Sequence, residues 1–252
     1  MKFRVVIPAR MGSQRLPGKP LCDVAGRPLV LRTADRARDS GAQSVVIATD
    51  DERIAKVCRA DGLDVVMTDS KHQSGTDRIA EVTRIRKWSD DNIIVNVQGD
   101  EPCLPPLNIS QVAGLLAGGT ADIATLSTPL NNSAELDDSN IVKVIVDQNG
   151  LAMYFSRAAI PWSDNVQRSL TQTPQRHIGI YAYRVGALQR FATTPPCELE
   201  RLERLEQLRA LWSGWPVAVA TATRVPGPGV DTAADLKAVC RLFASDTALG
   251  ER

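Results

Sequence analysis

Short apolar runs alternate with helical patterns through the first hundred residues of this 252-residue chain. The runs of strand length are Phe3–Ile7, Val45–Ala48, Leu63–Met67 and Ile93–Val97, and the helical patterns are Leu29–Ser40, Glu52–Ala60 and Asp77–Lys87. Strands that alternate with helices of this length form parallel sheets with right-handed crossovers. The pattern therefore predicts an α/β fold with a doubly wound, mostly parallel sheet.

The pattern changes after about residue 125 and predicts an antiparallel element there. Ile141–Asp147 and Leu151–Phe155 have the composition of strands, and the turn between them ends in Asn149-Gly150, which is typical of a hairpin. The remaining predicted elements are a strand at Ile178–Arg184, a helix at Glu198–Trp212, a strand at Val217–Ala222 and a helix at Thr232–Ala244. We expect a single domain, 1–252, with an antiparallel insertion at about 129–190.

Composition argues against several classes of protein. Thirty Lys and Arg residues nearly balance 29 Asp and Glu residues, whereas a general nucleic-acid binder carries a basic excess. No apolar run approaches the roughly 20 residues of a membrane helix, and no signal-peptide pattern precedes the first strand. The five cysteines are scattered and the two histidines form no Cys/His cluster, which indicates reduced thiols and argues against zinc. We expect a cytoplasmic protein.

The turn after the first strand carries three cations, Arg10, Arg15 and Lys19, among Gly and Pro residues. Ligands of parallel α/β sheets bind at the carboxyl ends of the strands, where this turn lies. Fixed cations and free backbone N–H groups suit a polyphosphate such as a nucleoside triphosphate. The turn matches neither the P-loop nor the dinucleotide motif. Arg15 could equally be solvated, whereas Lys19, between Gly18 and Pro20, is expected to be functional.

Carboxylates follow two other predicted elements. Asp100 comes directly after the buried run Ile93–Val97, at the same edge of the sheet as the opening turn. Mg²⁺ that accompanies a triphosphate prefers one or two carboxylates together with phosphate oxygens. The alternative for Asp100 is a turn residue that caps the next element. Asp231 lies in a rigid turn and is either a helix N-cap or a second metal ligand, which the sequence leaves open.

Further polar residues lie at the same predicted edge, in Ala48–Asp50 and Gln73–Arg78. Their side chains suit contacts to a base and a ribose. For Thr76 and Asp77, N-capping of the following helix is at least as good an explanation. Arg78 in a first helical turn is poorly placed for the helix dipole, which predicts a ligand or a carboxylate partner.

Polar and aromatic residues also gather in the predicted insertion. Arg157, His177 and Tyr181 together match an anionic, hydroxyl-rich ligand, whereas their apolar neighbours are expected to be core. His72, in contrast, precedes a helix without an evident partner and is expected to be a surface or capping residue.

The order of these motifs closely resembles the 3-deoxy-manno-octulosonate cytidylyltransferase (CMP-Kdo synthetase) family of bacterial lipopolysaccharide synthesis. The similarity runs almost end to end. The motifs that carry it are Ile7–Arg10, Arg15–Pro20, Ala48–Asp50, Gln73–Thr76, Asn96–Pro102, Val142–Val144, Tyr154–Arg157, Arg176–Tyr181, Leu205–Arg209 and Gly229–Thr232. The first and fifth are shared by the wider sugar cytidylyltransferase group, whereas F-S-R, R-H-I-G-I-Y and L-E-Q-L-R are specific to the Kdo enzymes. The chain departs from the family pattern at two places. Met11 stands where the family usually has an aromatic residue, and the tail after Ala244 matches nothing in the family.

The resemblance implies a nucleotide-diphospho-sugar transferase-like fold, CTP and Kdo as substrates, Mg²⁺ as cofactor, and a homodimer joined through the region after the first half. It implies Arg10, Lys19 and Asp100 as catalytic residues and Asp100 and Asp231 as metal ligands. The nucleotide-binding residues would be Pro8, Ala9, Arg10, Arg15, Lys19, Ala48, Asp50, Ser74, Arg78 and Gln98. The sugar-binding residues would be Gln98, Arg157, His177, Tyr181, Glu206 and Gln207.

Three alternatives stay open. Another acidic sugar, such as 8-amino-Kdo or a sialic acid, could replace Kdo, although the insertion motifs argue against sialic acid. A non-catalytic nucleotide-binding module is a second alternative, but such a module has no need of both a metal carboxylate and a polar pocket beside it. A nicotinamide-dependent reductase is weakened by the missing glycine motif.

Overall fold

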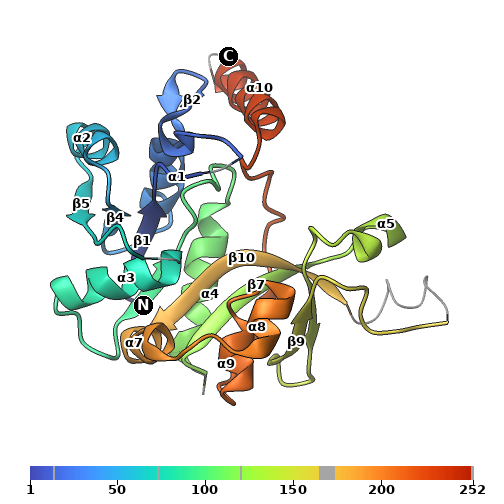
Figure 1. Ribbon diagram of the computed structural model, residues 1–252. Coiled ribbons are helices and arrows are strands. Elements are labelled where there is room, and N and C mark those ends of the chain that lie inside the picture. Colours follow the sequence, from blue (N-terminus) through green and yellow to red (C-terminus); the bar gives the residue numbers. More distant parts are fainter. Residues whose placement is uncertain (14, 73, 120, 165–173, 251–252) are drawn as a thin grey trace. The chain divides into compact units, whose positions relative to one another are not determined.

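The structure is a computed structural model that describes residues 1–13, 15–72, 74–119, 121–164 and 174–250 (Figure 1). The chain divides into two compact units. The N-terminal unit comprises residues 2–88, 94–110 and the chain from residue 224 onward, and the central unit comprises Met1, 89–93 and 111–223. The single domain 1–252 with an insertion at about 129–190 stays a prediction.

A mostly parallel sheet forms the centre of the N-terminal unit, as the sequence predicts. β1 (Phe3–Ala9) pairs in parallel with β4 (Val45–Thr49), and β4 pairs in parallel with β5 (Asp64–Met67). β6 (Ile93–Asn96) lies on the other side of β1. The consecutive residues Val5, Val6 and Ile7 of β1 are fully buried, which shows that both faces of this strand are covered.

Helices of the N-terminal unit follow these strands: α1 (Leu29–Arg38), α2 (Glu52–Ala60), α3 (Gly75–Ile85) and α10 (Ala233–Gly250). Phe243 of α10 packs in a small apolar cluster with Val24 and Leu29, and α10 lies beside β2 (Asp23–Val24) in Figure 1. No described helix, α10 included, has the length and apolar character needed to cross a bilayer.

Helix N-caps differ from the predicted ones at α3. Ser74 is the N-cap, and its hydroxyl accepts a hydrogen bond from the Asp77 N–H at 3.1 Å. The capping alternative for Thr76 and Asp77 is therefore wrong, because both lie inside the first turn of α3. Thr232 caps α10: its hydroxyl accepts from the Asp235 N–H at 3.2 Å, while the Asp235 carboxylate accepts from the Thr232 N–H at 2.8 Å.

A two-stranded hairpin of β2 and β3 (Arg27–Pro28) follows the opening turn. Arg27 of β3 joins this hairpin to two carboxylates outside it. The Arg27 guanidinium donates to both carboxylate oxygens of Asp35 and of Asp61, at 2.8 to 2.9 Å. Arg38 also donates to Asp61, at 2.8 Å. The hydrogen bond from Arg27, with a further one from Arg38, holds the pKa of Asp61 below its ordinary value despite the opposing effect of burial.

We expect Arg27→Met to lower the free energy of unfolding by about 1–3 kcal/mol at pH 7, because two part-buried carboxylates lose a shared partner. The lowered pKa of Asp61 gives the ion pair a stabilising effect that is present above the unfolded pKa of about 4 and is lost as the pH falls through the folded pKa. The variant and the wild type should therefore differ less at pH 3 than at pH 7 in urea denaturation. Arg53→Met, which removes an exposed partner of Asp51, is the control and should change nothing measurable. An equal loss at both pH values would contradict the ionic origin.

β7 (Ile123–Pro129) is the central strand of the central unit. It pairs in parallel with β11 (Val217–Thr221) and antiparallel with β10 (Gln175–Arg184). The chain then adds β8 (Lys143–Val146), which pairs antiparallel with both β10 and β9 (Ala152–Ser156). The antiparallel part predicted from the hairpin pattern is thus present, next to parallel pairs.

The described helices between residues 106 and 212 are α4 (Pro106–Ala117), which begins in the N-terminal unit, and α5 (Ser133–Asp137), α7 (Val185–Thr193), α8 (Glu198–Glu203) and α9 (Leu208–Trp212) of the central unit. The continuous helix predicted over Glu198–Trp212 is wrong. Arg204 adopts a left-handed conformation with φ of 54°, which ends α8 and separates it from α9. The sequence analysis also did not identify β7 or α4, in which apolar and polar residues alternate without a distinct period.

Candidate active site

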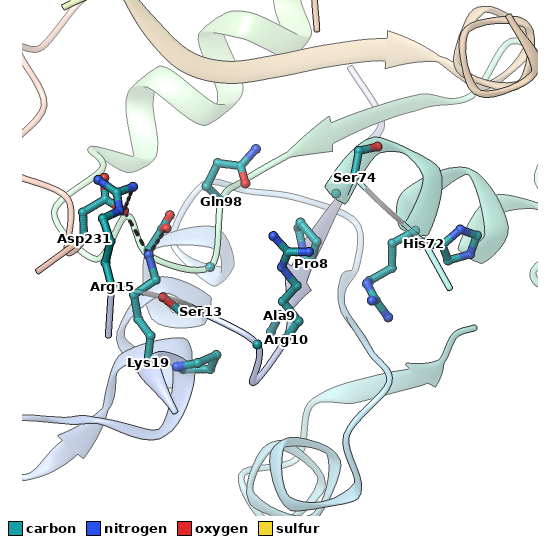
Figure 2. A pocket seen from close by; sticks show the side chains of 16 residues that line it. Pro8, Ala9, Arg10, Ser13, Arg15, Lys19, His72, Ser74, Gln98 and Asp231 are labelled. Carbon is teal, nitrogen blue, oxygen red and sulfur yellow. Dashed lines mark hydrogen bonds and ion pairs between the residues drawn. The ribbon is translucent and has the colours of Figure 1, made fainter. Parts of the chain in front are cut away.

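A cavity of about 660 Å³ opens at the carboxyl end of β1 in the N-terminal unit, a volume typical of small-molecule sites (Figure 2). Its sixteen lining residues are Pro8, Ala9, Arg10, Gly12, Ser13, Arg15, Lys19, Pro20, His72, Ser74, Gly75, Arg78, Gln98, Gly99, Asp100 and Asp231. Eight of the ten predicted nucleotide-binding residues and both predicted metal ligands are among them.

The ends of β1 and of the β6 segment approach each other closely at Gly99. A Cβ atom at Gly99 would lie 2.9 Å from the carbonyl oxygen of Pro8, so no larger residue fits without a shift of the backbone. The Thr33 hydroxyl donates to the Gly99 carbonyl at 3.2 Å and holds this turn from the other side. The close approach explains why Asp100, one residue further on, reaches the cavity.

Lys19 joins the two acidic side chains of the cavity. Its Nζ lies 2.5 Å from Asp100 Oδ2 and 3.1 Å from Asp231 Oδ1. Gly18, with φ of 71°, turns the chain immediately before Lys19, whose side chain is only 14% exposed. Burial by itself lowers the pKa of the Lys19 ammonium, but Asp100 and then Asp231 more than offset this, and its pKa is raised. Lys19 is therefore a fixed positive charge at the centre of the site.

Asp100 and Asp231 fit the chemistry of a magnesium site. They converge on the same ammonium although they are far apart in the sequence, and carboxylate oxygens are the ligands that Mg²⁺ prefers. Asp231 does not cap α10, since Thr232 does so. Within the described residues no group of three or more His, Cys, Asp or Glu side chains could hold a metal ion. A pair of carboxylates suits an ion that also takes phosphate oxygens from a nucleotide.

Arg10 and Arg15 project from the opening turn and differ in their surroundings. Arg10 is exposed and forms no ion pair within the described part of the chain, so its guanidinium is available to an anion. Arg15 pairs with Asp231 at 3.1 Å, and its side chain is 67% exposed. An ion pair this exposed contributes little by itself.

The opposite side of the cavity is formed by Ser74, Arg78 and His72; Figure 2 shows Ser74 and His72 away from Lys19 and Asp231. Arg78 is 3% exposed and donates to Asp50 at 2.9 Å, which confirms the expected carboxylate partner; it also donates to the Thr68 hydroxyl.

Three residues on this side differ from the sequence analysis. Ala48 is fully buried and is not among the residues that line the cavity, and Asp50, which accepts a hydrogen bond from Arg78, is not among them either. His72, expected to be a surface or capping residue without a partner, lies in the cavity wall, and its Nε2 is 2.6 Å from a Glu81 carboxylate oxygen. His72 precedes α3 and its partner Glu81 lies within α3, nine positions further along the chain. The sequence pattern around His72 therefore does not predict this contact, which depends on how the preceding segment folds back on α3.

The predicted sugar residues other than Gln98 lie in the central unit. His177 is in β10, with its ring centroid 5.1 Å from that of Phe155 and 5.4 Å from that of Tyr181. Its Nε2 lies 3.0 Å from the Thr125 hydroxyl. Arg157 follows β9 directly. Glu206 and Gln207 stand just before α9.

Burial sets the protonation of the two β10 side chains. It lowers the pKa of His177 to about 3, so the imidazole is neutral at pH 7. Burial also raises the pKa of Tyr181 well above its ordinary value, with smaller contributions from Tyr183 and Glu206, so the phenol stays protonated. Both groups can therefore offer neutral hydrogen bonds to a ligand.

We expect His177→Asn to make the free energy of unfolding depend less on pH below neutrality. The folded pKa of His177 is depressed, so the unfolded chain binds a proton at about pH 6.5 that the folded chain takes up only near pH 3. As the pH is lowered between these two pKa values, the free energy of unfolding of the wild type should therefore fall more steeply than that of the variant. In this pH range unfolding of the wild type takes up roughly one more proton than unfolding of the variant. Urea midpoints at pH 7.5 and pH 5 measure this difference. Leu188→Ala, a buried substitution in α7, is the control and should lower both midpoints alike; parallel profiles for His177→Asn and wild type would contradict the expected pKa.

The chain belongs to the cytidylyltransferase family, whose sequence model matches residues 4–221. A 3-deoxy-manno-octulosonate cytidylyltransferase of Aeromonas hydrophila subsp. hydrophila is 51% identical over 253 residues, which cover 97% of this chain and 100% of that protein. A solved structure of CMP:2-keto-3-deoxy-manno-octonic acid synthetase complexed with CTP superimposes with a TM-score of 0.89 at 39% identity, over 98% of this chain and 100% of that one.

Proposed function

We propose that this cytidylyltransferase activates Kdo with CTP and forms CMP-Kdo and pyrophosphate. The observation that carries the proposal is the convergence of Lys19, Asp100 and Asp231 in one cavity at the end of β1. A fixed cation and two carboxylates suit a triphosphate together with a divalent ion. The similarity to relatives named for this reaction supports the choice of substrates.

In the proposed reaction the anomeric hydroxyl of Kdo attacks the α-phosphorus of CTP. A new P–O bond forms to the sugar, the hydroxyl proton is released to water, the bond between the α-phosphorus and the bridging oxygen breaks, and pyrophosphate leaves. Arg10 and Lys19 bind the phosphates and offset the charge that develops on the leaving group. Positioning and charge neutralisation provide most of the rate enhancement in such transfers, so no covalent intermediate with the protein is needed.

The cavity residues have proposed roles in binding the nucleotide. Pro8, Ala9, Arg10, Arg15, Lys19, Ser74, Arg78 and Gln98 would contact CTP directly. Asp50 would act through Arg78, which it holds at 2.9 Å. Asp100 and Asp231 would bind Mg²⁺, which supplies charge neutralisation at the phosphates when it is bound. Ala48, which is fully buried in β4, would support the wall from behind.

The proposed sugar residues are Gln98, Arg157, His177, Tyr181, Glu206 and Gln207. An arginine, neutral imidazole and phenol groups, and amide and carboxylate oxygens match the carboxylate and hydroxyl groups of an eight-carbon sugar acid. We further propose a homodimer, in which exposed apolar side chains of the central unit such as Met153, Trp162 and Trp212 are candidates for the interface. The free state of all five cysteines supports a reducing, cytoplasmic location, and CMP-Kdo would serve lipopolysaccharide synthesis.

Incubation of the protein with CTP, Mg²⁺ and Kdo tests the proposal through release of pyrophosphate. Omission of each component in turn, and removal of divalent ions with a chelator followed by their return, should abolish and restore the signal. Parallel reactions with 8-amino-Kdo and with a sialic acid identify the preferred sugar. Binding of CTP without turnover on any of these sugars would favour a non-catalytic nucleotide-binding module and contradict the proposal.

A further inference from the structure

Lys143 is a fully buried cation that the proposed reaction does not use. Its side chain is 0% exposed, and Nζ donates to the carbonyl oxygens of Asp138 at 2.9 Å, Ile141 at 2.6 Å and Arg157 at 2.7 Å. These are three acceptors for the three donors of an ammonium group. Among the described residues it forms no ion pair, and burial lowers the pKa of Lys143. An apolar side chain would fill such a position without desolvating a charge, so the ammonium needs an explanation.

The group that Lys143 holds is the backbone of Arg157. Lys143 lies directly opposite Ser156 in the antiparallel pair of β8 and β9, so its side chain reaches the carbonyl of the next residue. Glu203, the last residue of α8, holds the N–H side of the same residue, Arg157. Its carboxylate accepts from the Arg157 N–H at 2.9 Å and from the Ser156 hydroxyl at 2.5 Å. Two oppositely charged side chains thus clamp one residue at its N–H and at its C=O.

The same two residues also determine where the Arg157 guanidinium lies. Nε of Arg157 donates to the Glu203 carbonyl at 2.9 Å, and Nη1 donates to the Ser139 carbonyl at 2.9 Å. Ser139 belongs to the turn 138–141, two of whose carbonyls are bound by Lys143. Nη2 is left without a hydrogen-bond partner in the described part of the chain. The guanidinium is therefore held on two sides and keeps one donor group for a ligand.

The clamp is connected to two other proposed sugar residues of the central unit, His177 and Glu206. The His177 N–H donates to the carbonyl of Val142 at 2.8 Å, and Val142 directly precedes Lys143. Glu203 comes three residues before Glu206 in the chain. A shift of β8 or of the end of α8 would consequently move Arg157 relative to His177 and Glu206.

We propose that Lys143 and Glu203 are positioning residues that fix Arg157 in the orientation needed to bind the carboxylate of the sugar acid. The inference rests on the proposed function, in which Arg157 binds the sugar. Neither residue touches the reacting atoms; both act through Arg157. Preorganisation of a binding group matters because a misplacement of about 1 Å costs on the order of 10²-fold in rate.

Steady-state kinetics of Lys143→Met test the proposal. Methionine fills a similar volume without donors, so we expect the KM for Kdo to rise about 10- to 100-fold while kcat at saturating Kdo falls much less. CTP binding, measured by calorimetry in the absence of sugar, should stay within about twofold, because its proposed residues lie in the N-terminal unit. Val144→Ala is the matched control: it is the next residue of β8, fully buried, and points to the opposite face. It should lower the melting temperature without a change in the KM for Kdo.

A double-variant cycle separates positioning from a general structural role. If Lys143 acts through Arg157, the KM for Kdo of Lys143→Met/Arg157→Ala should equal that of Arg157→Ala alone. Additive effects, or an unchanged KM in Lys143→Met, would overturn the proposal. An unchanged KM in Arg157→Ala would instead contradict the sugar-binding role on which it rests. If Lys143→Met does not fold, the same double-variant cycle with Glu203→Gln tests the proposal. That substitution removes the charge of the carboxylate that accepts from the Arg157 N–H and so weakens the other side of the clamp.

Discussion

Asp100→Asn is expected to lower kcat by about 10²- to 10³-fold while the protein keeps its fold and melting temperature to within a few degrees. The substitution removes a negative charge from one of the two carboxylates that converge on Lys19 and leaves the shape of the side chain unchanged. In the proposed reaction that charge holds Mg²⁺ at the phosphates. Pyrophosphate release at saturating CTP and Kdo measures the loss.

Two further measurements make this result specific. Asp39→Asn, at an exposed position after α1 and away from the cavity, should leave kcat unchanged. Raising the Mg²⁺ concentration should recover part of the activity of Asp100→Asn if the defect is weak metal binding. More than about a tenth of wild-type turnover in Asp100→Asn under saturating conditions would show that Asp100 is a turn residue.

Lys19→Met is expected to have an effect of similar size, with a different kinetic signature. The variant loses the Lys19 ammonium, which contacts both carboxylates, and we expect kcat/KM for CTP to fall about 10²- to 10³-fold. Mg²⁺ in the absence of nucleotide should still bind, because the carboxylates remain and no longer share a protein cation. Pyrophosphate release and metal titration calorimetry measure the two properties separately.

Arg15→Met is the matched control for Lys19. Arg15 contacts the same Asp231, but its side chain is 67% exposed whereas that of Lys19 is 14% exposed. Solvent screening should therefore limit its effect to about tenfold or less. If Arg15→Met were as inactive as Lys19→Met, the fixed charge at the centre of the cavity would not be the property that matters.

Most of the N-terminal unit follows from its sequence. The apolar runs at Phe3–Ile7 and Val45–Ala48 and the helix at Glu52–Ala60 lie where the sequence places them, within one or two residues. Local periodicity suffices there, because a strand buried on both faces and an amphipathic helix each have a recognisable pattern. The position of Lys19 and Asp100 at the same edge follows from the topology of parallel sheets, without knowledge of side-chain contacts.

Helix ends and irregular segments were harder to predict. The left-handed Arg204 divides the segment predicted as one helix, although arginine normally favours helices. The N-cap of α3 was expected at Thr76 or Asp77 but is Ser74, whose extended backbone precedes the helix. Several residues in each segment have suitable side chains, so composition alone does not decide between them.

The sequence by itself determined the fold class, the family resemblance and the residue types that a nucleotide and a metal require. Only the tertiary structure decided which partners these residues have: Asp231 with Lys19, Asp50 with Arg78, His72 with Glu81, and Lys143 with the carbonyl of Arg157. The physical reason is that periodicity reports on neighbours within one helix or strand. Contacts between residues up to 212 positions apart arise from the packing of whole elements, which no local pattern encodes.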